Sequence, residues 1–276
     1  MKIVWGIFLG LLSYCAVAAS PRLVVLSPNA VEMLFEIGAG DSIIGTVAYA
    51  DYPEAAKQIP RIGRYDFIDF EAMLLLNPDA VVMDSGSISQ MLMNRLEQFG
   101  IALIDTKVTQ IEKIPERLLQ LGRETGHESQ ASRAAQEFNQ TLEALKHQYR
   151  NRAVIDVFLQ IWPEPLTTSA SSWMNEIIQD CGGSNVFSNS VNEYPQVSVE
   201  QVLLALPEVI IKPVHGDRSQ MDTKWQAWPE IPAVANHQII NIDGDLIYRT
   251  GPRVLQGMMQ ICAIIDTARQ QKLHHD

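Results

Sequence analysis

Short apolar runs alternate with stretches of helical periodicity over the first half of the chain. The runs that we interpret as buried strands are residues 22–26 (RLVVL), 43–48 (IIGTVA), 80–84 (AVVMD) and 101–106 (IALIDT). Helices are predicted through residues 33–37 and 69–76, and a further helix ends at Gly100. This order of elements predicts a small parallel sheet covered by helices.

One long amphipathic segment, residues 128–150, interrupts this alternation. Its apolar side chains recur at helical spacing between Gln, Glu, Lys and Arg; they are Ala131, Ala134, Ala135, Phe138, Leu142, Leu145 and Tyr149. The segment contains no glycine or proline. We therefore expect one continuous helix of about 20 residues, roughly 30 Å long.

A second α/β region follows the long helix. Its predicted strands cover residues 154–161, 209–212 and 239–242, and a last helix runs from residues 251–253 towards Arg269. The expected fold class is α/β, with two Rossmann-like lobes joined by a single long helix. We place the boundaries at 1–19 for a leader, 20–127 for the N-terminal lobe, 128–150 for the linking helix and 151–276 for the C-terminal lobe.

A tyrosine–glutamate–helix–strand unit occurs once in each lobe. YDFIDFEAMLLLNPDAVVM begins at Tyr65 and YPQVSVEQVLLALPEVIIK begins at Tyr194, so equivalent residues differ by 129 in number. When the two units are aligned, the tyrosine, the glutamate (Glu71 and Glu200) and a later proline occupy equivalent positions. Two similar lobes that face each other form a cleft, and clefts between domains are preferred ligand sites.

The N-terminus has the pattern of a secretory signal peptide. Lys2 precedes the apolar run IVWGIFLGLLSYCAV, and small residues follow at Ala18 and Ala19, which predicts cleavage before Ser20. A membrane anchor is the alternative, but the uncharged stretch is shorter than the span of about 20 residues that a bilayer requires.

Composition narrows the classes of function. The net charge of −11 argues against nucleic acid as a partner, because nucleic-acid binding requires a basic face. The predicted mature chain keeps two cysteines, Cys181 and Cys262. In an oxidising compartment such a pair favours a disulfide over two separate buried thiols.

Aromatic residues follow several predicted strands, where the side chains of α/β folds face a cleft. The candidates are Tyr49, Tyr52, Tyr65, Trp162, Tyr194 and Tyr248. Any one of them also suits a core or turn position. Several that converge would hold a large, flat, partly apolar ligand by stacking and edge contacts.

No residue pattern indicates catalysis or a bare metal. The six histidines form no recognisable pair on one face of an element, and GxSxG, HExxH and P-loop motifs are absent. We expect a protein that is not an enzyme, with no catalytic residue, no metal site and no cofactor.

Glu71 and Glu200 each follow a good N-cap residue, Asp69 or Ser198, by two positions, which places both glutamates in a first helical turn. Two interpretations stay open. The carboxylates could complement the helix dipole, which is worth about 0.3–1 kcal/mol. Alternatively, they could present matched charges to arginines of a two-fold partner.

Five ordered motifs point to a known family. They are PRLVVLSPNAVEMLFEIGAGDSIIGTVAYADYP, NPDAVV, DCGGSNVF, YPQVSVEQVL and GPRVLQGMMQIC. Together they resemble the BtuF family of periplasmic cobalamin-binding proteins, over the chain from about Ser20 to the last helix. The resemblance implies a helical-backbone (class III) binding protein of the Gram-negative periplasm, monomeric before docking. It would capture cobalamin (vitamin B12) and deliver it to an inner-membrane ABC permease with its ATPase (BtuC/BtuD-like).

The resemblance also implies roles for single residues. Implied ligand contacts are Tyr49, Tyr65, Tyr194, Asp245, Leu246, Ile247, Tyr248 and Arg249. It implies that Glu71 and Glu200 dock onto permease arginines and that Cys181 pairs with Cys262.

The chain departs from the family pattern at two positions. Asp84 and Leu166 stand where the family has aromatic residues, and Trp162 could compensate. The alternative ligands are therefore another corrinoid, a siderophore or haem.

Overall fold

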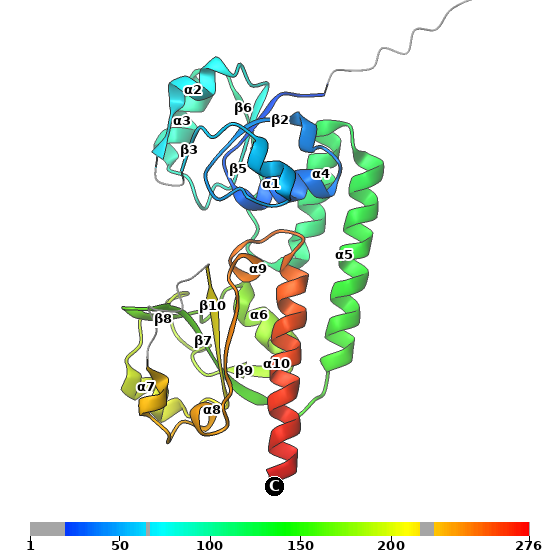
Figure 1. Cartoon of the computed structure of the whole chain (residues 1–276). Helices are drawn as coiled ribbons and strands as arrows, with labels where there is room; N and C mark the ends of the chain where they lie inside the picture. Colours follow the sequence, from blue (N-terminus) through cyan, green and yellow to red (C-terminus); the bar gives the residue numbers. More distant parts are fainter. Residues whose placement is uncertain (1–19, 65–66, 216–223, 276) are drawn as a thin grey trace, which may run out of the picture.

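The computed structural model describes residues 20–64, 67–215 and 224–275. Two α/β lobes lie along one long helix, α5 (Glu128–Tyr149), as Figure 1 shows. The predicted fold class is thereby confirmed. The predicted leader, residues 1–19, falls outside the described residues.

The N-terminal lobe is built on a four-stranded sheet of order β2-β1-β5-β6, in which every pairing is parallel. The strands are β1 (Leu23–Val25), β2 (Ile43–Thr46), β5 (Ala80–Met83) and β6 (Ala102–Asp105). The helices are α1 (Pro28–Glu36), α2 (Phe70–Leu75), α3 (Gln90–Gln98) and α4 (Ile114–Thr125), and a small hairpin joins β3 (Gly63–Arg64) to β4 (Phe67–Ile68). The apolar runs that predicted the four strands are confirmed, whereas α4 was not predicted.

The C-terminal lobe has a five-stranded sheet that is not wholly parallel. Its strands are β7 (Ile155–Pro163), β8 (Leu166–Thr168), β9 (Gly183–Asn185), β10 (Val209–Val214) and β11 (Ile239–Asp243). The helices are α6 (Trp173–Asp180), α7 (Val199–Ala205), α8 (Pro232–Ala235), α9 (Asp245–Tyr248) and α10 (Val254–His275). Strand β8 returns antiparallel to β7. Trp162 therefore lies within a hairpin strand and not after the strand as predicted.

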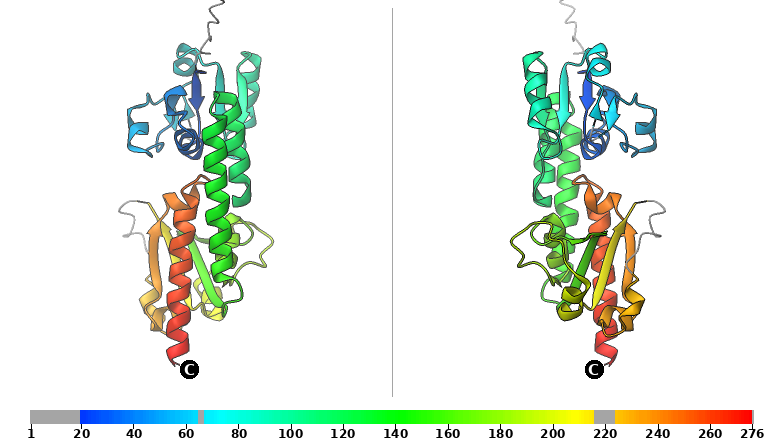
Figure 2. Two further views of the ribbon diagram at one scale, coloured as in Figure 1. Left: turned by 90° about the vertical axis from the view of Figure 1, so that its right-hand side faces the viewer. Right: turned by 90° about the vertical axis from the view of Figure 1, so that its left-hand side faces the viewer.

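Helix α5 confirms the long amphipathic segment. All seven apolar residues predicted to share one face are buried. At 22 residues the helix is about 33 Å long, which is enough to run past both lobes. The side views show α5 along both lobes and α10 along the C-terminal lobe (Figure 2).

Helices α4 and α5 approach each other closely at Gly122. A Cβ atom placed there would lie 2.4 Å from the Cβ of Ala131, so only glycine fits. Beyond this contact, the largest apolar cluster contains buried residues of both lobes and of α5. The lobes therefore share a packed core. None of the helices in the described part of the chain is long and apolar enough to cross a bilayer.

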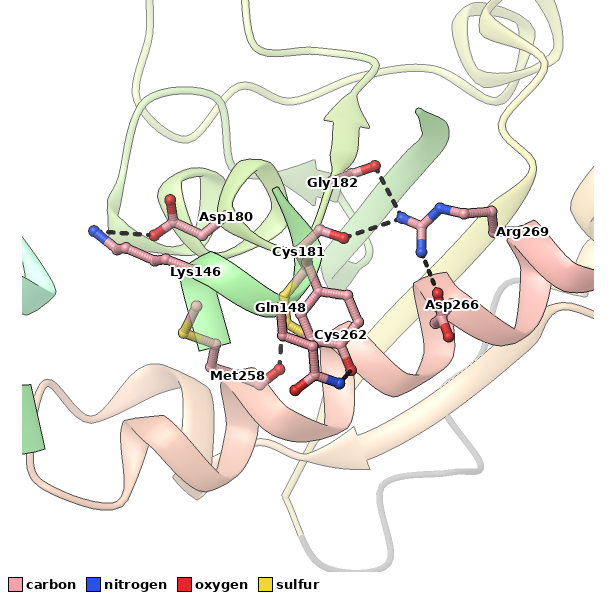
Figure 3. The surroundings of a disulfide bond; sticks show 10 residues. Lys146, Gln148, Asp180, Cys181, Gly182, Met258, Cys262, Asp266 and Arg269 are labelled. Carbon is pink, nitrogen blue, oxygen red and sulfur yellow. Dashed lines mark hydrogen bonds and ion pairs between the residues drawn. A yellow bond between two sulfur atoms is a disulfide. The ribbon is translucent and has the colours of Figure 1, made fainter. Parts of the chain in front are cut away.

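A disulfide crosslinks the C-terminal lobe, as predicted. Cys181 ends α6 and bonds to Cys262 in α10, which closes a separation of 81 residues. Figure 3 shows Arg269 beside it, where the guanidinium donates to the carbonyl of Cys181 at 3.1 Å. On the other side, Lys146 of α5 lies 3.4 Å from Asp180. The end of α6 is thus fixed to both long helices.

Candidate ligand-binding cleft

A cleft of about 570 Å³ lies between the lobes. In the N-terminal lobe it is lined by residues that directly follow β1, β2, β5 and β6. In the C-terminal lobe it is lined by the loop at Glu193 and Tyr194, by Trp173 and by the segment 248–250. Ligands of open α/β sheets bind at the carboxyl ends of the strands, so the fold gathers the residues after those strands into one site.

Tyr49 enters the cleft from the N-terminal lobe. Its backbone is left-handed, with a φ of 69°, which is unfavourable for a residue with a Cβ atom. The guanidinium of Arg249 donates a hydrogen bond to the carbonyl oxygen of Tyr49 at 3.0 Å, and this contact from the other lobe holds the turn. The side chain is 65% exposed, so the ring is available to a ligand.

Tyr194 enters from the C-terminal lobe and lines the cleft. Burial, together with the neighbouring charge of Glu193, raises the pKa of Tyr194 to about 12. The phenol therefore stays neutral at physiological pH and keeps its proton. It can offer a ligand its ring face, while its hydroxyl is hydrogen-bonded to Glu193 and Ser172.

Two further aromatic rings are fixed by hydrogen bonds from their polar atoms. The Tyr248 hydroxyl lies 3.0 Å from the carbonyl oxygens of Ile161 and Pro213. The indole of Trp173 donates to the carbonyl of Ile247 at 2.9 Å. Because these bonds hold the rings in place, both present preorganised surfaces to the cleft.

An ion network centred on the buried Glu32 joins the two lobes at the cleft. Glu32 of α1, whose side chain is 2% exposed, lies 3.0 Å from Arg249 and accepts two hydrogen bonds from Arg253, at 2.6 and 2.9 Å. Arg249 also lies 3.0 Å from Asp51 and 3.0 Å from Asp245. Three carboxylates therefore surround Arg249.

Asp84 directly follows β5 and lines the cleft on the side of the N-terminal lobe. Burial raises the pKa of Asp84, with a smaller contribution from Asp105, while a hydrogen bond from the Gly86 N–H opposes the shift. The positive charge of Lys107 also lowers the pKa of Asp84 and so opposes part of the shift. Asp84 and Lys107 both line the cleft.

The structure brings together only some of the residues singled out in the sequence. Tyr49, Tyr194, Tyr248 and Arg249 line the cleft, whereas Tyr52 and Trp162 are not among its lining residues. The indole of Trp162 donates instead to the carbonyl of Glu164 at 3.0 Å. Tyr65 falls outside the described residues.

The other predicted contacts in the 245–249 stretch, Asp245, Leu246 and Ile247, are not among the residues that line the cleft. Leu246 and Ile247 are 6% and 0% exposed, and Asp245 pairs with Arg249. Sequence reasoning passed over Trp173 and Glu193. The one signal for Trp173 was Ser172, a good N-cap residue, which predicts that a helix begins at Trp173. The Ser172 hydroxyl does accept the Met174 N–H, at 3.2 Å.

The two repeated glutamates lie in the first turns of their helices, as predicted. The Asp69 side chain caps α2 by accepting the Ala72 N–H. Ser198 caps α7 in a capping box with Gln201. Both glutamate side chains are exposed, and hydrogen bonds from Ser198 and from the backbone at the helix start lower the pKa of Glu200.

The sequence matches the family described as Periplasmic binding protein over residues 23–246. A Vitamin B12-binding protein from Vibrio campbellii is 32% identical over 91% of each chain. The chain belongs to the periplasmic binding protein family. Among solved structures, the periplasmic vitamin B12 binding protein BtuF of Vibrio cholerae has a TM-score of 0.83 and 30% identity, covering 91% of this chain and 98% of its own.

The same fold also occurs in family members named for a different ligand. The periplasmic heme-binding protein RhuT from Roseiflexus has a TM-score of 0.79 at 22% identity, with 91% of this chain and 99% of that chain covered. At this identity the likeness establishes the fold alone, so the choice of ligand depends on the lining of the cleft.

Proposed function

We propose that this protein captures cobalamin in the cleft between its lobes and delivers it to an ABC importer. The observation that carries the proposal is a preorganised cleft with aromatic residues from both lobes, in a chain whose relatives include Vitamin B12-binding proteins. Its volume of about 570 Å³ falls within the usual range for small-molecule sites. Binding requires no chemical step, so we propose a carrier and not an enzyme.

The shape of the ligand fits the aromatic walls. Cobalamin is a flat cobalt corrin whose rim carries neutral carboxamide groups. Tyr49 and Tyr194 approach from opposite lobes and can contact the macrocycle by stacking and edge contacts. Asp84 and Lys107 supply an acceptor and a donor for carboxamides at the rim.

The charge of the cleft favours a corrinoid over haem. Haem carries two anionic propionates, which bind well where arginine or lysine is available. Here Arg249 already faces three carboxylates. The other cation of the described lining, Lys107, lies beside Asp84, and Glu193 adds a further acid.

Calorimetry of the purified mature protein tests the ligand. Cyanocobalamin should bind one to one, cobinamide should bind as a smaller corrinoid, and haemin should bind at least tenfold more weakly than cyanocobalamin. If neither corrinoid releases heat, or if haemin binds more tightly, cobalamin is not the ligand.

The cellular setting completes the proposal. We propose that residues 1–19 direct export and are removed, and that residues 20–127 and 151–276 form the two lobes about the helix 128–150. The mature chain then acts in the periplasm as a monomer that docks onto a BtuC/BtuD-like permease and ATPase. Mass spectrometry of the periplasmic protein should find Ser20 at its N-terminus.

Docking is proposed to use Glu71 and Glu200. Both are exposed, and each lies in the first turn of the equivalent helix of its lobe. Exchange of both for glutamine should reduce uptake of cobalamin by cells at least tenfold while the affinity for cobalamin stays unchanged. If the double variant loses ligand affinity instead, the glutamates belong to the binding site.

A further inference from the structure

Over their described residues, the two copies of the repeated unit share features of local structure as well as sequence. Helices α2 and α7 are both short and both capped at the N-terminus by a side chain. After each helix comes a left-handed residue, Asn77 with φ 48° and Leu206 with φ 47°. These two residues are equivalent in the repeat, so both helices are followed by a left-handed residue at the same position.

The exposed positions of α2 are conserved in α7. The exposed side chains of α2 are Glu71 and Leu75, and their equivalents in α7, Glu200 and Leu204, are exposed as well. Leu75 is 86% exposed and Leu204 is 85% exposed. Residues four apart on a helix lie on one face, so each lobe presents a carboxylate with a leucine one turn further on.

Single exposed apolar residues are ordinary on protein surfaces. A leucine at the same position of both units, with the same exposure and beside the same acid, is harder to attribute to chance. In Figure 1, α2 and α7 lie on the outer parts of the two lobes, on the side away from α5. The right-hand view of Figure 2 shows both helices on one side of the molecule.

We propose that Leu75 and Leu204 are docking residues for the importer. Each leucine enters an apolar recess beside a cation on one of two equivalent permease subunits, while the neighbouring glutamate pairs with that cation. The inference rests on the proposed function, since it requires delivery to a permease. It adds an apolar anchor to each charged contact, and an anchor of this kind stabilises a complex more than a solvated ion pair does.

The repeated pair favours this partner over two others. A second copy of this chain would bring carboxylate against carboxylate if equivalent patches met. A lipid surface with anionic headgroups would repel the glutamate next to each leucine. A protein with two equivalent sites, each with a cation beside an apolar recess, satisfies both residues of both patches.

The test measures binding of the ligand-loaded mature protein to the permease–ATPase complex of the source organism in lipid nanodiscs, with empty nanodiscs in parallel. Leu75→Ser and Leu204→Ser should each weaken docking about tenfold, as expected for loss of one buried leucine, and the double variant by more. Leu273→Ser, at a leucine of α10 that is 68% exposed, is the matched control and should dock normally. Cobalamin affinity and melting temperature should be unchanged in all.

Each other outcome has a distinct meaning. If Glu71→Gln with Glu200→Gln weakens docking and the leucine variants do not, the leucine proposal fails and the docking function stands. If none of these variants weakens docking, both fail. If the leucine variants lose binding to empty nanodiscs, or change the oligomeric state in light scattering, the leucines contact lipid or a second copy and the proposal is overturned.

Discussion

On their outer faces the two lobes match. Helices α2 and α7 each expose a glutamate followed one turn later by a leucine, and each is followed by a left-handed residue. On their inner faces the lobes differ. The N-terminal lobe offers the acid Asp84 and the strained turn at Tyr49, whereas the C-terminal lobe offers Trp173 and Tyr248, both held by hydrogen bonds.

This difference agrees with the proposal that the two faces serve different partners. A ligand without two-fold symmetry gains nothing from matched walls, so the cleft residues are free to diverge. The proposed partner with two equivalent subunits would gain from matched patches, and the recurrence of acid and leucine together is consistent with that proposal. The lobes also differ in covalent crosslinking, because the described disulfide lies wholly in the C-terminal lobe.

The largest expected effect comes from the disulfide. Replacement of Cys181 and Cys262 together by serine should lower the free energy of unfolding by about 4 kcal/mol, because the bond closes a loop of 81 residues in the unfolded chain. Urea unfolding measures the loss, and hydrogen exchange locates it. Exchange should accelerate mainly in α6 and α10. Equal acceleration in the N-terminal sheet would show that the lobes unfold as one unit.

The next effect concerns the contact between the lobes. Glu32→Gln leaves Arg249 and Arg253 without their shared buried carboxylate and should cost about 3 kcal/mol. Glu36→Gln, one turn later on the same helix, is the control, because burial and the charge of Glu137 already raise the pKa of that carboxyl. Small-angle scattering should show looser lobes only for Glu32→Gln. Equal stability of the two variants would mean that the network does not hold the lobes.

Ligand affinity tests whether both lobes contribute to the cleft. Tyr49→Ala and Tyr194→Ala should each weaken cobalamin binding about tenfold, which corresponds to about 1.4 kcal/mol. Tyr→Phe at each position is the control, since it keeps the ring. Calorimetry would refute two-sided binding if only one of the alanine variants lost affinity.

The smallest effect is the pH dependence of two neighbouring acids. Burial raises the pKa of Asp84, so the folded state holds this proton more tightly than the unfolded chain does. The resulting stability is present below the unfolded pKa of about 3.9 and is lost as the pH rises through the folded pKa. Asp84→Asn should therefore be as stable as the parent protein, or slightly more stable, at pH 7.

Asp105 is the matched control with the opposite sign. Burial alone would raise its pKa, but hydrogen bonds from the Ser85 side chain and from the N–H groups of Ser85 and Lys107 lower it overall. Its contribution is present above the unfolded pKa and is lost as the pH falls through the folded pKa. Asp105→Asn should lower the melting temperature at pH 7 and less so at pH 3. Parallel pH profiles for the two variants would contradict these assignments.

Local pattern determined most of the elements of this protein. The apolar runs predicted the four strands of the N-terminal sheet and three strands of the C-terminal sheet. The spacing from Ala131 to Tyr149 predicted the buried face of α5, because a continuous periodic segment leaves little choice of conformation. The pair Cys181 and Cys262 likewise predicted the disulfide. Strands β8 (LTT) and β9 (GSN) were missed because neither short, mostly polar segment forms an apolar run.

The tertiary structure alone decided which residues meet in the cleft. Trp173 and Tyr248 reach it through hydrogen bonds to backbone atoms distant in sequence, and Glu32 meets Arg249 across 217 positions. Such partners leave no periodic trace in the chain. Exposure is likewise a property of the packed lobe: Leu74 packs against the apolar cluster of its lobe, while its neighbour Leu75 is 86% exposed. The sequence repeats both leucines, and only the fold turns one of them outward.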